Sequence, residues 1–113
     1  NQAFLVQVNS LLERKTLEQI FNSLAQHHES LRLRYQYKGE GHWRQYYENS
    51  SQLFYLNDCS HLNEEAFYKA FNQSQSQFDL EKGPLLTISF RCHQGQTQIL
   101  MAMHHLIVDG LSW

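Results

Sequence analysis

The sequence predicts an α/β sandwich in which one mostly antiparallel sheet carries helices on a face. Several short stretches alternate apolar and polar residues, which is typical of half-buried strands. Two other stretches repeat apolar residues at helical spacing. Apart from a short strand candidate at residues 53–56, the segments follow the order strand, helix, strand, strand, helix, strand, strand. The chain has 113 residues, which is room for one domain, and its 42% apolar residues provide material for a core.

The first half of the chain supplies one helix and one hairpin. Residues 3–9 alternate from the outset and predict a strand. A helix is predicted from an N-cap at Thr16 to about His28. Its apolar face consists of Leu17, Ile20, Phe21 and Leu24. The hairpin follows, with strands in residues 31–38 and 43–47 joined by a glycine-containing turn. Residues 31–38 alternate apolar and polar side chains, so we expect their arginines on the polar face.

The second half repeats this pattern. Residues 53–56 form a short apolar strand, and a second helix is predicted over residues 63–77. Its buried stripe consists of Ala66, Phe67, Ala70 and Phe71. Residues 83–84, Gly-Pro, prevent the helix from continuing. Two strands follow in residues 85–91 and 98–103 around a polar turn.

The composition excludes several classes of function. A formal net charge of −2 offers no basic face for a nucleic acid or an anionic membrane. No apolar run approaches the roughly 20 residues that cross a bilayer, and no signal-peptide pattern is present. Cys59 and Cys92 lack a C-x-x-C spacing, so we expect two reduced thiols in a cytoplasmic protein. The histidines lack the i, i+4 spacing of metal-binding helices, so no metal site is expected.

The stretch "MHHLIVDG" carries the chemistry that the sequence most clearly indicates. The apolar strand at residues 98–103 delivers His104 and His105 to its end, where successive side chains point to opposite faces. One imidazole is then structural, and the other is available for proton transfer near neutral pH. Asp109 fixes the loop or orients an imidazole, and Gly110 permits a tight turn. The alternative is a pair of histidines whose hydrogen bonds are satisfied at a loop edge.

Three segments resemble one known family. Residues 103–113, "MHHLIVDGLSW", closely resemble the third core motif of the condensation-domain superfamily of nonribosomal peptide synthetases. Residues 27–35, "HHESLRLRY", and residues 78–86, "FDLEKGPLL", are similar to two further motifs in the same order. The resemblance implies a chloramphenicol-acetyltransferase-like two-layer sandwich. Residues 1–113 would then form a partial N-terminal lobe of a condensation- or epimerization-type domain.

The resemblance also implies a branch of the superfamily. The ending "DGLSW" is similar to the epimerization form of the motif, H-H-x-x-x-D-x-x-S-W. An epimerization domain is therefore expected, with a peptide-bond-forming condensation domain as the first alternative. A non-catalytic carrier-docking relative and a stand-alone acyltransferase remain as further alternatives.

The family pattern implies a role for each matching residue. His105 matches the catalytic base, and His104 matches the inward, structural histidine. Asp109 matches an aspartate that braces the motif through a salt bridge, and Gly110 matches the turn glycine. Ser112 and Trp113 complete this motif as supporting residues. His28, Glu29 and Arg32 match a motif whose role is that of a scaffold.

The implied substrate is an aminoacyl or peptidyl thioester on the phosphopantetheine arm of a peptidyl carrier domain. The enzyme would remove the Cα proton and return a proton to the other face. No cofactor is expected to bind directly, because the phosphopantetheine belongs to the carrier. The further partners implied are a C-terminal lobe and neighbouring synthetase modules. Both reactions need a tunnel between two lobes, so residues 1–113 alone are expected to be inactive.

Overall fold

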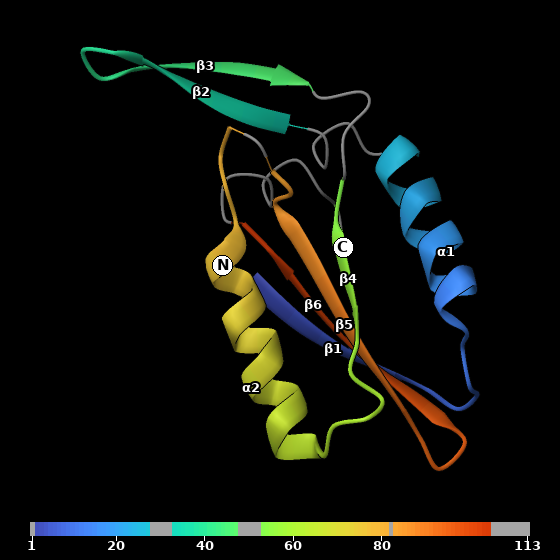
Figure 1. Ribbon diagram of the computed structural model, residues 1–113. Coiled ribbons are helices and arrows are strands. Elements are labelled where there is room, and N and C mark those ends of the chain that lie inside the picture. Colours follow the sequence, from blue (N-terminus) through green and yellow to red (C-terminus); the bar gives the residue numbers. More distant parts are fainter. Residues whose placement is uncertain (1, 28–32, 48–52, 82, 105–113) are drawn as a thin grey trace.

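The computed structural model describes residues 2–27, 33–47, 53–81 and 83–104 (Figure 1). Within them the chain forms a four-stranded sheet, a two-stranded sheet and two α-helices. The elements in chain order are β1 (Gln2–Val8), α1 (Arg14–His27), β2 (Leu33–Gly39), β3 (His42–Tyr47), β4 (Tyr55–Asp58), α2 (Glu64–Ser74), the 3-10 turn η2 (Gln75–Gln77), β5 (Leu86–His93) and β6 (Gln96–Met103).

The larger sheet has the strand order β1-β6-β5-β4. The strand β6 pairs antiparallel with both β1 and β5, while β4 joins β5 in parallel. The predicted α/β class with a mostly antiparallel sheet is therefore confirmed. The hairpin of β2 and β3 forms a sheet of its own, which extends beyond one end of the larger sheet (Figure 1).

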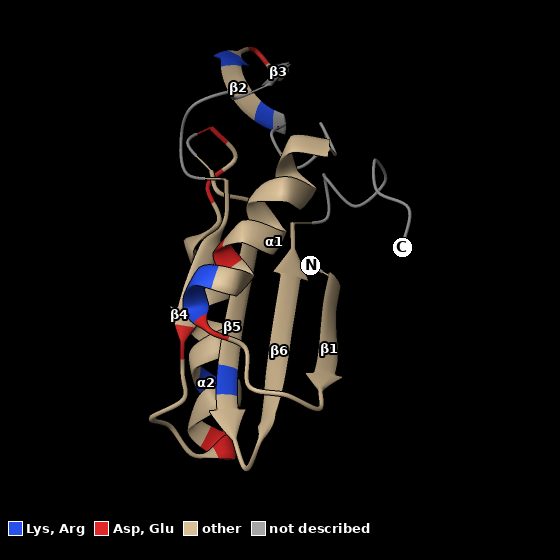
Figure 2. Cartoon of the chain, turned by 90° about the vertical axis from the view of Figure 1, so that its right-hand side faces the viewer, with Lys and Arg blue, Asp and Glu red and all other residues tan. Residues whose placement is uncertain are grey.

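The two helices cover opposite faces of the larger sheet, which the sequence did not predict. In Figure 2, α1 lies in front of the sheet and α2 lies behind it. The central strand β5 explains this arrangement, because its first five residues are all buried. Ile88 and Phe90 belong to the core under α1, whereas Leu100 and Ala102 of β6 pack with α2 on the other side. A central strand buried on both faces needs cover from both sides.

The helix α1 begins two residues before the predicted N-cap. Leu17 donates its backbone N–H to the Glu13 carbonyl at 3.1 Å, so helical hydrogen bonding is established upstream of Thr16. Arg14 adds a side-chain hydrogen bond to the Leu56 carbonyl at 2.8 Å, which ties the start of α1 to β4. The N-cap assigned to Thr16 was therefore wrong, because Thr16 lies inside the helix.

The helix α2 follows the sequence prediction closely. Asn63 is its N-cap, and its side-chain oxygen accepts the Ala66 backbone N–H at 2.8 Å. Phe67 and Phe71 are buried against the sheet. The polar end of the predicted helix tightens into η2. The short strand before α2 was misplaced by two residues, since β4 begins at Tyr55 rather than Leu53.

The hairpin places an arginine where the alternating pattern predicted an exposed side chain. Arg34 is 0% exposed, whereas Tyr37 lies at the surface beside Trp43, with ring centroids 5.1 Å apart. The polar face predicted for Arg34 is therefore wrong. The cause is a later segment that packs across the base of the hairpin: a Cβ added to Gly83 would collide with the guanidinium of Arg34.

We call residues 78–85 the bridging segment, of which all but residue 82 are described. Its Leu80 carbonyl accepts the Tyr35 backbone N–H at 2.6 Å. Glu81 accepts the Tyr37 backbone N–H at 3.2 Å through its side chain. The Asp79 carbonyl accepts the Gly83 backbone N–H at 2.7 Å and closes the segment into a turn. These bonds hold β2 against the segment that leads into β5.

Gly83→Ala is expected to destabilise the protein more than Gly95→Ala. Both glycines have positive φ, +66° and +77°, so each alanine carries a conformational cost of about 1–2 kcal/mol. Only Gly83 also faces the buried Arg34, whereas a Cβ on Gly95 meets nothing within 4 Å. Overpacking adds about 1–3 kcal/mol at Gly83. Urea unfolding of both variants measures the difference, and equal losses would contradict the close contact with Arg34.

Candidate active site

The candidate site begins where β6 ends. The backbone N–H of His104 donates to the Leu85 carbonyl at 2.8 Å, which continues the pairing of β5 with β6 for one more residue. The half-buried imidazole of His104 meets the ring of Phe78 edge-on, with centroids 6.1 Å apart. Both contacts come from the bridging segment. The sheet and this segment therefore fix His104 at the strand end.

The bridging segment also brings together the motifs recognised in the sequence. It contacts β2 through Tyr35 and the end of β6 through His104. These three stretches are far apart in the chain, and each belongs to one of the three matched motifs. Their meeting at one end of the sheet is what a common site requires.

Most of the predicted site residues lie outside the described residues. They are His28, Glu29, Arg32, His105, Asp109, Gly110, Ser112 and Trp113. Their roles stay predictions, as does the structural role of His104, whose place in the fold is described above.

One face of the sheet carries an exposed apolar surface beside this strand end. Phe4 and Val6 of the edge strand β1 are 36% and 41% exposed, and their partners on β6 are Met101 and Ile99. Ile20 of α1 is 50% exposed. It lies on the opposite flank of the helix from Glu18, which pairs with Arg14 near β4, so Ile20 faces the side of β6 and β1. We call Phe4, Val6 and Ile20 the open apolar face.

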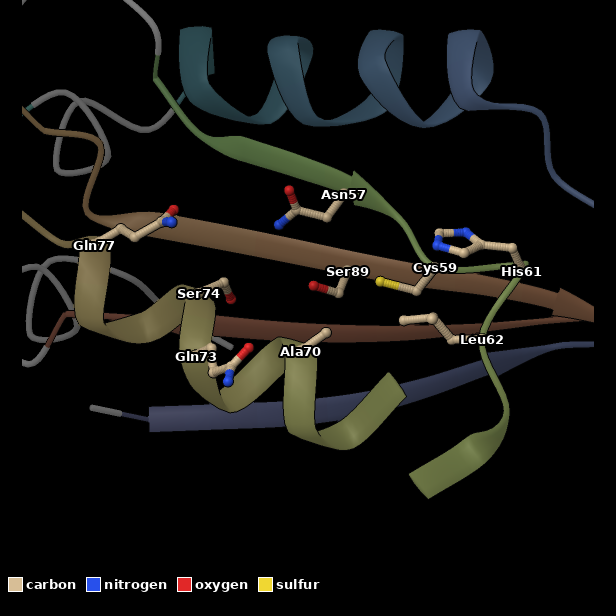
Figure 3. A pocket seen from close by; sticks show the side chains of 9 residues that line it. All are labelled: Asn57, Cys59, His61, Leu62, Ala70, Gln73, Ser74, Gln77 and Ser89. Atoms are coloured by element: carbon tan, nitrogen blue, oxygen red, sulfur yellow. The ribbon is translucent and has the colours of Figure 1, made fainter. Parts of the chain in front are cut away.

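A cavity of about 310 Å³ occupies the other face, between α2 and the strands β4 and β5 (Figure 3). No sequence pattern predicts this cavity, because its lining comes from several separate segments. One signal was available: Thr87 and Ser89 interrupt the apolar run of β5 on the same face. Polar residues at successive inward positions of a buried strand indicate a polar environment on that face.

The electrostatics beside this cavity favour a neutral thiol and an ionised carboxylate. Burial raises the pKa of the Cys59 thiol, and the neighbouring negative charge of Asp58 adds to the rise. Burial would also raise the pKa of Asp58, but hydrogen bonds from Ser60 and the positive charges of Arg14 and His61 outweigh it. The pKa of Asp58 therefore lies below its ordinary value.

A family model for the condensation domain matches residues 1–113, the whole chain. The chain belongs to the condensation-domain family. Among curated relatives, a linear gramicidin synthase from Brevibacillus parabrevis is 36% identical over all of this chain. The condensation-domain chain spans only 2% of that relative's length.

Two solved structures share this fold. The epimerization domain from the third module of tyrocidine synthetase B matches 93% of this chain with a TM-score of 0.81 and 27% identity. The starter condensation domain of rhizomide synthetase RzmA matches 92% with a TM-score of 0.68 and 18% identity, which shows the shared fold. This condensation-domain chain covers 25% of the first structure and 26% of the second. The expected chloramphenicol-acetyltransferase-like fold is confirmed. The assignment of residues 1–113 to a partial N-terminal lobe stays a prediction.

The described residues show neither a metal-binding cluster nor a membrane-spanning helix. They contain no group of three or more His, Cys, Asp or Glu side chains that could hold a metal ion. None of their helices is both long and apolar enough to span a membrane. Cys59 and Cys92 are both free thiols. Figure 2 shows basic and acidic residues interspersed along the elements rather than gathered into one basic stripe.

Asp58→Asn is expected to destabilise the condensation-domain chain in a pH-dependent way. Because the folded pKa is lowered, the ionised carboxylate stabilises the fold above the ordinary aspartate pKa of about 4. This stabilisation is lost as the pH falls through the folded pKa. The side chain is exposed, so the loss at pH 7 stays below about 1 kcal/mol. Unfolding free energies of both proteins at neutral pH and near pH 3 measure it. If Asp58→Asn lowers the unfolding free energy equally at both pH values, the lowered pKa of Asp58 is contradicted.

Proposed function

We propose that this chain is part of an epimerization domain of a nonribosomal peptide synthetase. The observation that carries the proposal is the likeness to the tyrocidine synthetase epimerization domain, which exceeds the likeness to the starter condensation domain in both TM-score and identity. The ending "DGLSW" supports the same branch. The substrate would be an aminoacyl or peptidyl thioester carried on the phosphopantetheine of a peptidyl carrier domain.

In this reaction a base removes the proton from Cα, and the electron pair delocalises onto the thioester carbonyl oxygen. A proton returned to the opposite face of Cα inverts the centre, so no atom is gained or lost. We propose that His105 is the base on one face, because a neutral imidazole accepts a proton near neutral pH. An acid from the second lobe would act on the other face. His104 would be a positioning residue, since its backbone is bonded to Leu85 and its ring rests on Phe78.

Strand alternation gives a reason for two adjacent histidines. The ring of His104 contacts Phe78, which packs against both core clusters. On β6, Ala102 packs with the α2 side of the core and Met103 with the α1 side, so alternation puts His104 on the side of α2. Successive strand positions serve opposite faces, so we propose that His105 acts on the side of α1. That side carries the open apolar face, which is the side left available for another lobe.

We further propose that the rest of the same domain covers the open apolar face. This chain accounts for 25% of the solved epimerization domain, so most of such a domain lies elsewhere in the polypeptide. An apolar surface beside a strand end that carries a catalytic motif suits a tunnel wall between two lobes. The carrier domain and neighbouring modules would then bind from outside this tunnel.

His105→Ala in the full-length protein is expected to lower the epimerization rate by at least about a hundredfold, because general-base catalysis contributes about 10²–10⁴. The assay loads an L-aminoacyl thioester on the carrier in D₂O. It follows the uptake of deuterium at Cα and the fraction of product that has the D configuration. His93→Ala is the control, since His93 lies exposed at the end of β5. Unchanged deuterium uptake in His105→Ala would overturn the base assignment.

The same preparation distinguishes the alternative function. The family model and the fold shared with the starter condensation domain favour a condensation domain as the second candidate. In that case the wild-type protein forms a dipeptide between two loaded carriers and leaves Cα unexchanged. If neither reaction occurs, the chain belongs to a non-catalytic carrier-docking relative.

Ile20→Glu is expected to destabilise the full-length protein, whereas Gln19→Glu is not. Both residues lie on α1, but only Ile20 belongs to the open apolar face. If the remainder of the domain covers that face, a carboxylate there becomes buried and costs about 2 kcal/mol or more. Thermal unfolding and limited proteolysis of the two variants measure the difference. Equal behaviour of the pair would argue against coverage of this face.

A further inference from the structure

The cavity under α2 is separate from the proposed reaction. It lies on the face of the sheet opposite α1, whereas the open apolar face lies on the side of α1. Its volume of about 310 Å³ is large enough for a small organic molecule. Figure 3 shows side chains facing it from both α2 and the strands.

The chemistry of the lining restricts what can occupy the cavity. Among the described residues that line it, none is Lys, Arg, Asp or Glu. The lining does include His61, but this side chain is exposed, so solvent screens its charge. An ion entering it would lose hydration without gaining a charged partner of opposite sign. The thiol of Cys59, whose pKa is raised by burial, supplies no thiolate at neutral pH. The occupant is therefore uncharged.

The polar groups of the lining match an amide. Asn57 from β4 and Gln73 from α2 face each other across the cavity, and Gln77 extends this side (Figure 3). Each side-chain amide offers both donors and an acceptor, which is the complement of another amide. Leu62 and Ala70 make the other part apolar.

The hydroxyl of Ser89 gives an independent reason to expect an occupant. Ser89 is 1% exposed, lies on the wall of the cavity, and its Oγ has no hydrogen-bond partner at normal geometry within the described residues. It lies close enough to Cys59 to oppose the rise of that thiol's pKa. A buried hydroxyl without a well-placed partner destabilises the fold, so a group that bonds to it has a favourable place to bind.

We infer that this cavity binds a small uncharged amide, with the amide group among Asn57, Gln73 and Ser89 and an apolar end against Leu62 and Ala70. The inference does not depend on which reaction the domain catalyses. Benzamide is a suitable probe, because it combines a primary amide with a compact apolar ring. Benzoate is its matched anion, with nearly the same shape.

Saturation-transfer NMR on the full-length protein tests the inference, since it detects a weakly bound probe on a large protein. Benzamide is expected to receive saturation, and benzoate is not. Ala70→Leu fills the cavity and Ser89→Ala removes the hydroxyl; each is expected to weaken benzamide binding by about tenfold, in line with the loss of one good contact. Asn72→Leu introduces a leucine on the exposed side of α2 instead and leaves binding unchanged.

Each other result overturns the inference. Absence of a benzamide signal in the wild-type protein means that ordered water alone occupies the cavity. Equal binding of benzoate rules out selection for an uncharged group. If both Ala70→Leu and Ser89→Ala bind as the wild type does, the probe binds elsewhere. Ser89→Ala removes a single atom, so it keeps the test valid should Ala70→Leu fail to fold.

Discussion

The architecture of the candidate site depends on the bridging segment. Its backbone carbonyls accept hydrogen bonds from two elements: from Tyr35 of β2 and from His104 at the end of β6. Among the described strands β2 and β3 pair only with each other, so no strand pairing joins the hairpin to the larger sheet. A turn of eight residues thus fixes the relative position of two elements that the sheet itself does not connect. This explains why such a stretch carries a distinctive sequence although it forms no regular element.

The two faces of the larger sheet differ in how completely they are covered. Under α2, Phe67 and Phe71 are fully packed and the remaining space forms a polar cavity. On the side of α1 the helix protects β4 and β5, while Phe4 and Val6 of the edge strand β1 stay exposed. Leu5 of β1 is exposed on the opposite side, next to Leu100. An exposed edge strand with apolar side chains is a liability in a free domain. A second lobe that packs against this strand would bury its apolar side chains, and this is the arrangement proposed for this family member.

The sequence predicted most of the fold because periodicity records local burial. The boundaries of α2 and the two hairpins could be predicted from the sequence, because Asn63 and the glycine turns are local signals. The burial of Arg34 was not, because it results from contact with a segment almost fifty residues later. The coverage of both faces also escaped prediction: an apolar run in β5 shows burial but does not show which helix provides it. The cavity needed three-dimensional proximity of residues that share no sequence pattern.

The difference between the two faces gives a physical reason for two adjacent histidines. A strand end presents adjacent side chains to opposite sides, and here the two sides are chemically distinct. One side offers Phe78 and a closed core to His104, which suits a residue that holds the backbone in place. The other side borders apolar surface that the described residues leave open. A base must meet a substrate yet stay rigidly held. The proposed base, His105, would meet both needs, because its neighbour His104 is anchored through its backbone to Leu85 and so restrains the chain that carries the base.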